Sequence, residues 1–256
     1  MLSTIQSMPE KIIQATGLRK EFGTTTAVHE LSLDVTRGSV CALLGGNGAG
    51  KTTTMAMLLG QVRPTAGEVL MFGERFDRRQ PSTLARMNFS SPFFDLPSRL
   101  TVFQNLNVYT RLYAVPDAEA RLDELARELD LAGLMQRRYG SLSAGQKTRV
   151  AMAKAMINHP ELLLLDEPTA SLDPDSADMV RTFLEEYRAK HGMTILIASH
   201  NMYEVERLCD DVVMMQKGRI VDRDDPASLL DRYGRETLEE VFLDIVRSPS
   251  GEYAAR

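Results

Sequence analysis

The chain has 256 residues, of which 43% are hydrophobic, so it can bury a substantial core without disulfides or a structural metal. Its formal net charge of -5 argues against a nucleic-acid surface spread over the whole protein, and we expect no nucleic-acid partner. No apolar run reaches the roughly 20 residues that cross a bilayer, and residues 1–10 lack the regions of a signal peptide. We therefore expect a cytoplasmic protein whose residues 1–10 form a flexible N-terminus.

The first part of the chain predicts a small β lobe. Residues 11–33 carry short extended patterns, and residues 67–73 are punctuated by glycines like a hairpin, so we expect antiparallel pairing. Between them, residues 40–44 form an apolar strand that runs into a glycine-rich turn. Residues 51–59 then read as a helix closed by Gly60.

The later elements predict a helical lobe followed by alternating strands and helices. Residues 100–134 have helical spacing with a dense charge face, and we place a helical lobe at about residues 93–150. Strands near 162–165, 194–198 and 212–215 then alternate with helices near 177–191 and 203–208, which is typical of a mainly parallel sheet. Residues 226–256 read as a C-terminal helical tail.

Residues 45–52, Gly-Gly-Asn-Gly-Ala-Gly-Lys-Thr, fit the phosphate-loop pattern between a strand and a helix. Glycine amides and the positive helix end can surround an anion, Lys51 can reach the outer phosphates and the Thr52 hydroxyl can ligate Mg²⁺. The alternative is a tight turn with a solvated lysine. We predict ATP contacts from Gly46, Asn47, Gly48, Ala49, Gly50, Lys51, Thr52 and Thr53.

A strand of four leucines, residues 162–165, ends in Asp166 and Glu167. Because open α/β sheets bind ligands at the carboxyl ends of their strands, Asp166 suits Mg²⁺ and Glu167 suits a catalytic base that polarises water. The alternative is an ordinary strand end with solvated acids. With the phosphate loop, this pattern predicts an α/β P-loop NTPase with a mainly parallel sheet, a small antiparallel β lobe and an inserted α-helical lobe.

A third motif, Leu142-Ser143-Ala144-Gly145-Gln146, resembles the signature of ATP-binding cassette (ABC) proteins, which usually have glycine at the position of Ala144. Ser143 and Gln146 also form a capping box, which alone would explain the pair. The free amides at this helix start make a second anion site, distinct from the one at Lys51. A second copy of the chain would be needed to bring that site to the γ-phosphate.

Further motifs follow in the family order, and the resemblance covers roughly residues 11–222; we assign the ABC ATPase domain to residues 11–225. By resemblance, His200 contacts the γ-phosphate as a catalytic residue. Asp173, in a D-loop-like segment with Ser171, helps communication across the dimer. Phe22 stacks on adenine, the alternative being a core aromatic of the small lobe. His29, His159 and His191 carry no motif and are interpreted as surface or loop histidines.

One stretch departs from the family pattern. Cassette ATPases usually carry a glutamine ahead of the helical lobe, but residues 88–94 contain none, and Gln104 lies in a predicted helix. Either Ser90 or Ser91 contacts Mg²⁺ in its place, or water fills the position. Phe93 and Phe94 form either a groove for a membrane partner or part of the helical-lobe core.

The resemblance implies an ATPase subunit that binds ATP and Mg²⁺ between two copies of itself. It would sit on the cytoplasmic face of the inner or plasma membrane and power a separate permease. The tail at residues 237–245 resembles the drug, polysaccharide and lipid exporter branch, although importer subunits share every catalytic motif. A soluble cassette ATPase acting on DNA or ribosomes would ordinarily carry a coiled-coil insertion or two cassettes. A P-loop kinase or helicase would leave residues 142–146 and His200 unexplained.

Overall fold

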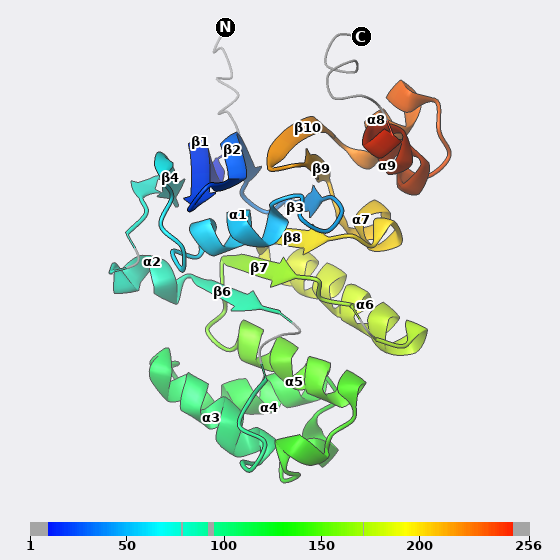
Figure 1. Cartoon of the computed structure of the whole chain (residues 1–256). Coiled ribbons are helices and arrows are strands. Elements are labelled where there is room, and N and C mark those ends of the chain that lie inside the picture. Colours follow the sequence, from blue (N-terminus) through cyan, green and yellow to red (C-terminus); the bar gives the residue numbers. More distant parts are fainter. Residues whose placement is uncertain (1–9, 78, 92–94, 171, 248–256) are drawn as a thin grey trace, which may run out of the picture.

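The computed structural model describes residues 10–77, 79–91, 95–170 and 172–247, which form two sheets with surrounding helices (Figure 1). The expectations for residues 1–9, for Phe93 and Phe94, for Ser171 and for the end of the chain lie outside these residues. Within the described ranges, none of the helices is both long and apolar enough to span a membrane.

The small sheet is antiparallel, with the strand order β2-β1-β4-β5. The first two strands are twelve residues each, longer than the short patterns expected, and irregularities in their register divide the pairing. Its strands are β1 (Lys11–Phe22), β2 (Thr25–Thr36), β4 (Ala66–Met71) and β5 (Glu74–Arg75).

The large sheet has six strands in the order β10-β9-β3-β8-β7-β6, and only the edge strand β10 is antiparallel. This confirms the predicted mainly parallel α/β core. Two of its strands, β6 and β10, were not predicted, because β6 is short and partly polar and β10 is an edge strand in which four of six side chains are charged. The strands are β3 (Val40–Leu44), β6 (Met87–Ser90), β7 (Leu162–Asp166), β8 (Thr194–Ser199), β9 (Asp211–Gln216) and β10 (Arg219–Asp224).

The helices cover the large sheet on both faces (Figure 1). The helical lobe comprises α3, α4 and α5, and the tail contains α8 and α9. The helices are α1 (Lys51–Leu58), α2 (Pro81–Ala85), α3 (Val102–Leu112), α4 (Ala118–Glu128), α5 (Ala144–Met156), α6 (Pro174–His191), α7 (Met202–Leu208), α8 (Pro226–Tyr233) and α9 (Leu238–Arg247), with short 3₁₀ turns at Ala132–Leu134 and Tyr139–Ser141.

Side-chain alternation along the central strands divides the core in two. In β7, Leu163 and Leu165 join the core made with the helical lobe and α6, whereas Leu162 and Leu164 join the core made with α1 and the small sheet. Because both faces are covered, every residue of β3, β7 and β8 is buried. The carboxyl ends of these strands therefore have a rigid support.

Gly67 marks a close crossing between β1 and β4. Its φ is +87°, and an added Cβ would lie 2.4 Å from the carbonyl oxygen of Gly17. We expect Gly67→Ala to lower the free energy of unfolding by about 2 kcal/mol or more, because left-handed strain and overpacking combine. Urea unfolding monitored by circular dichroism measures the loss.

Gly73 supplies the matched control, since its φ is +80° but an added Cβ would meet open space. Gly73→Ala should carry only the conformational cost, about 1 kcal/mol. Equal losses for the two variants would show that the crossing at Gly67 is not close enough to matter.

Candidate functional site

Three chain segments converge where adjacent parallel strands end. In the register of the sheet, Leu44 of β3 pairs with Ser199 of β8, and Asp166 of β7 pairs with Ala198. The residues that follow these strands border a pocket of about 1050 Å³, slightly above the roughly 300–1,000 Å³ usual for ligand sites. All eight predicted ATP-binding residues from Gly46 to Thr53 line it, together with Asp166, Glu167 and His200.

Lys51 begins α1 and is 7% exposed despite its charge. Its Nζ donates to the carbonyl of Gly45 at 2.5 Å and lies 4.0 Å from Oε1 of Glu167. Burial lowers the pKa of Lys51, and the nearby carboxylates oppose this shift. Gly48 and Gly50 have φ values of +77° and +101°, which allow the preceding turn to fold back onto the helix start. The loop therefore holds a cation beside backbone amides, as an anion site requires.

Asp166 and Thr52 form the oxygen-rich side of the pocket. Asp166 is 4% exposed and is hydrogen-bonded to the Thr52 side chain. Burial raises the pKa of Asp166, and the charge of Glu167 raises it further. A divalent cation would relieve this crowding of negative charge, and carboxylate and hydroxyl oxygens are ligands that Mg²⁺ prefers. The two residues thus fit the predicted metal site.

Glu167 and His200 lie in direct contact, with His200 Nδ1 2.7 Å from Glu167 Oε2. The backbone of Glu167 has a φ of +51°, a strained value for a residue with a side chain. Its amide donates to the carbonyl of Ala198 at 2.8 Å, which anchors this turn to β8. The fold therefore holds the predicted base and the predicted γ-phosphate residue together.

The signature residues begin α5 as predicted. Ser143 Oγ accepts from the amide of Gln146 at 3.3 Å, and Gln146 Oε1 accepts from the amide of Ser143 at 3.1 Å, which confirms the capping box. A Cβ added to Gly145 would lie 2.5 Å from Ser176 Oγ, and both the amide and the hydroxyl of Ser176 bond to Asp173. Gly145 and Asp173 therefore meet at the start of α6.

The same-chain pocket reaches the start of α5 through one predicted signature residue, Ala144. Ala144, Lys147 and Thr148 line its far wall, but Ser143, Gly145 and Gln146 do not line it. Ser143 is exposed. Within one chain, three of the four predicted signature residues therefore lie outside the pocket.

The structure separates the alternatives predicted for Phe22 and for the two serines, Ser90 and Ser91. Phe22 is 52% exposed, so the alternative of a core aromatic is wrong, and its adenine contact stays a prediction because it does not line the pocket. Ser91 is buried and lines the pocket, whereas Ser90 ends β6 and does not line it. Gln104 forms a capping box with Thr101, which occupies its side chain at the start of α3.

Several pocket neighbours were missed from the sequence, and three of them come from distant parts of the chain. His29, interpreted as a surface or loop residue, lies within β2 and lines the pocket, as does Lys217. A Cβ added to Gly46 would lie 3.5 Å from the Phe242 ring, so the C-terminal helix α9 packs against the phosphate loop. Neither spacing nor composition connects such distant positions.

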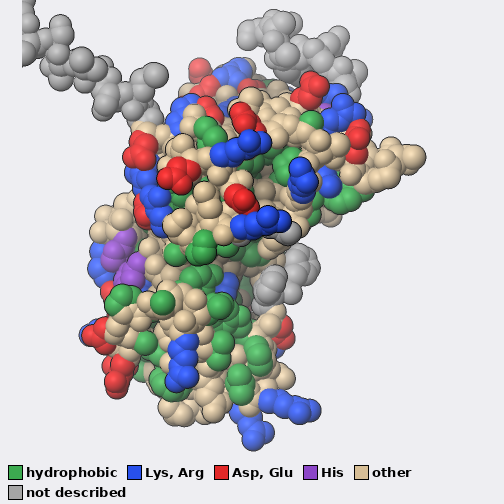
Figure 2. Space-filling model, turned by 90° about the vertical axis from the view of Figure 1, so that its left-hand side faces the viewer, with side chains coloured by type: hydrophobic (Ala, Val, Ile, Leu, Met, Phe, Trp, Pro, Cys, Tyr) green, Lys and Arg blue, Asp and Glu red, His purple; other side chains and the backbone are tan. Residues whose placement is uncertain are grey.

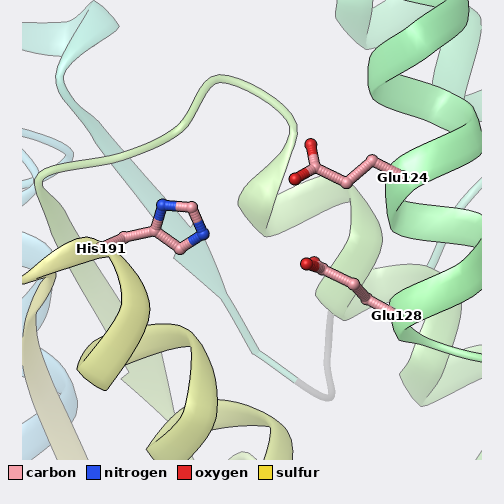
Figure 3. A group of neighbouring side chains, drawn as sticks. All are labelled: Glu124, Glu128 and His191. Carbon is pink, nitrogen blue, oxygen red and sulfur yellow. The ribbon is translucent and has the colours of Figure 1, made fainter.

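A second polar group joins the helical lobe to α6. Glu124 and Glu128 of α4 point toward His191 (Figure 3), and their ligating atoms lie within 4.8 Å of one another. Arg121 Nη1 lies 2.6 Å from Glu124 Oε2, and Lys190 Nζ lies 2.8 Å from Glu128 Oε1. Because both carboxylates already have cationic partners, this group is an electrostatic contact between lobes.

A family profile described as ABC transporter matches residues 28–170. The chain belongs to the ABC transporter family. Nod factor export ATP-binding protein I of Paraburkholderia xenovorans is 38% identical over 228 residues, which cover 87% of this ABC protein and 74% of the relative. Bacitracin transport ATP-binding protein BcrA of Bacillus licheniformis is 34% identical over 89% of this chain and 74% of its own.

Solved structures agree with this assignment. CbiO1 from Clostridium perfringens, described as part of the ABC transporter complex cbiONQ, is 28% identical with a TM-score of 0.79, covering 94% of this chain and 96% of its own. An ATP-binding subunit of an ABC transporter is 26% identical with a TM-score of 0.82, covering 92% of this chain and all of its own. The predicted fold is confirmed, and this ABC protein is an ATP-binding ATPase subunit.

Proposed function

We propose that this ABC protein hydrolyses Mg-ATP between two copies of itself and powers export through a separate membrane permease. The contact between Glu167 and His200 beside the buried ammonium of Lys51 is the observation that carries the proposal. The relatives named for Nod factor export and bacitracin transport support export as the direction of transport. The proposal includes an ATPase domain at residues 11–225 and a tail at residues 226–256.

The pocket residues take separate roles in the reaction. Lys51 and the phosphate-loop amides hold the β- and γ-phosphates, and Glu167 accepts a proton from the attacking water. The water oxygen bonds to the γ-phosphorus while the bond to the bridging oxygen of ADP breaks. His200 orients the γ-phosphate. Mg²⁺, when bound, supplies positive charge to the phosphates, and Thr52 and Asp166 would hold it.

The second copy completes the site through the start of α5. Ser143 is exposed and does not line the same-chain pocket, and the helix that it caps offers backbone amides and a positive dipole end. Residues 143–146 of one copy would meet the γ-phosphate held by the other. Asp173 lies beside Gly145 at the start of α6 and ends the loop that follows Glu167. A displacement of the signature residues would therefore also displace this loop.

The permease contact would use the helical lobe. Phe103, Val108 and Leu112 of α3 are exposed, Leu112 to 71%. In Figure 2, hydrophobic side chains are scattered over the helical part of the face shown, whereas charges of both signs cover the upper part. Val108 and Leu112 lie four residues apart and share one face of α3, so we assign the permease contact to this face. Docking there would place the chain on the cytoplasmic face of the inner or plasma membrane.

Glu167→Gln tests the proposed function. The amide preserves shape but cannot accept the proton, so turnover should fall by roughly 10²–10⁴-fold while ATP still binds. ATPase assays and equilibrium ATP binding measure the two quantities. Lys51→Ala is the contrasting variant and should weaken ATP binding itself, because it removes a ground-state phosphate contact. Wild-type turnover in Glu167→Gln would rule out Glu167 as the base.

Ser143→Arg tests the second copy. We expect it to leave ATP binding by the monomer intact but to block ATP-dependent dimers, because the arginine fills the anion site at the start of α5. Light scattering is measured with ATP in the Glu167→Gln background, with and without Ser143→Arg. Dimers that persist in the double variant would contradict the shared site.

Ser91 is the proposed replacement for the missing glutamine, since it lines the pocket and Ser90 does not. Ser91→Ala should raise the Mg²⁺ concentration needed for half-maximal ATPase activity by roughly 3-fold, as expected for loss of one modest polar contact. Ser90→Ala is the matched control and should behave as wild type. An unchanged Mg²⁺ requirement in Ser91→Ala would show that Ser91 does not contact Mg²⁺ and would favour water in the position of the missing glutamine.

A further inference from the structure

Glu204 is a carboxylate that the proposed roles do not use. It lies on α7, four residues after His200, and is 0% exposed. Burial raises the pKa of Glu204. A charge-bearing group buried to this extent requires specific partners, because desolvation alone would cost several kcal/mol.

The partners of Glu204 lie on both sides of His200. Ser199 Oγ donates to Glu204 Oε2 at 2.8 Å, and Ser199 Oγ also accepts from the amide of Asn201 at 3.0 Å. The amide of Glu204 in turn donates to Asn201 Oδ1 at 3.3 Å. The residues immediately before and after His200 are thus held in one closed network.

The turn that Glu204 holds is also bonded to the segment that carries Glu167. The amide of Glu167 donates to the carbonyl of Ala198, the residue before Ser199, at 2.8 Å. Thr169, two residues after Glu167, and Arg181 of α6 both lower the pKa of Glu204 and so favour its charged form. Glu204 therefore supports the turn of His200, whose side chain meets Glu167 at 2.7 Å in the pocket.

We propose that Glu204 is a positioning residue for ATP hydrolysis, which holds the His200 turn in register with Glu167 through its hydrogen bond with Ser199. This inference rests on the proposed roles of Glu167 and His200. Positioning matters because a displacement of about 1 Å at a reacting centre can cost on the order of 10²-fold in rate. Glu204 acts through these residues and does not touch the substrate.

The first test is Glu204→Gln in the full chain. Glutamine keeps the shape but loses the charge facing Arg181 and one of the two acceptors, so kcat should fall on the order of 10-fold while the Kd for ATP changes by less than about 2-fold. Glu186→Gln, a similar change at an exposed position of α6, should leave both values unchanged. An unchanged kcat, or parallel changes in kcat and Kd, would overturn the proposal.

A double-mutant cycle tests whether Glu204 acts through His200. If it does, Glu204→Gln combined with His200→Ala should be no slower in a single turnover than His200→Ala alone. Losses that multiply would show an independent, structural effect and overturn the proposal. Ser199→Ala removes the same hydrogen bond with a smaller deletion, and it serves in the same cycle if Glu204→Gln does not fold.

These outcomes are separable from failure of the proposed function. If Glu167→Gln hydrolyses ATP at the wild-type rate, the proposed base is wrong whatever Glu204 does. If Glu167→Gln is inactive but Glu204→Gln has wild-type kcat, only the positioning role is lost.

Discussion

A lysine ammonium buried beside two carboxylates is the interaction on which the rest of the structure depends. Lys51 begins α1 after the loop that follows β3, and Asp166 and Glu167 lie at the end of β7. These groups tolerate burial because each offsets the charge of the other, and because phosphates and Mg²⁺ would complete the balance. The parallel sheet supplies this arrangement, since it brings strand ends far apart in sequence to one edge.

The surrounding core keeps that edge rigid while the turns beyond it carry strain. The leucines of β7 pack alternately into two cores, so a shift of one residue would exchange the leucines between the cores and turn Asp166 to the other face. The left-handed backbone of Glu167 is held by its bond to Ala198. Strain held by well-packed neighbours is typical of sites that pre-organise reactive groups.

Sequence patterns predicted the local parts of this site and missed the contacts between distant parts. The phosphate loop, the acidic strand end and the capping box at Ser143 each depend on residues a few positions apart, so spacing reveals them. The packing of Phe242 on Gly46 and the burial of Glu204 depend on tertiary placement. Strand β6 is short and partly polar, so hydrophobic periodicity gave it no signal. Phe22 is exposed, which agrees with the predicted adenine contact, but it does not line the pocket, so that contact stays a prediction.

The central claim is that one chain holds the phosphates and a second chain completes the hydrolytic site. The most direct measurement is the ATPase activity per chain of the purified wild-type protein, followed over a wide range of protein concentration at saturating Mg-ATP. If a second chain completes the site, activity per chain rises with concentration and then saturates as dimers form. Constant activity per chain down to concentrations at which light scattering shows only monomers would contradict it.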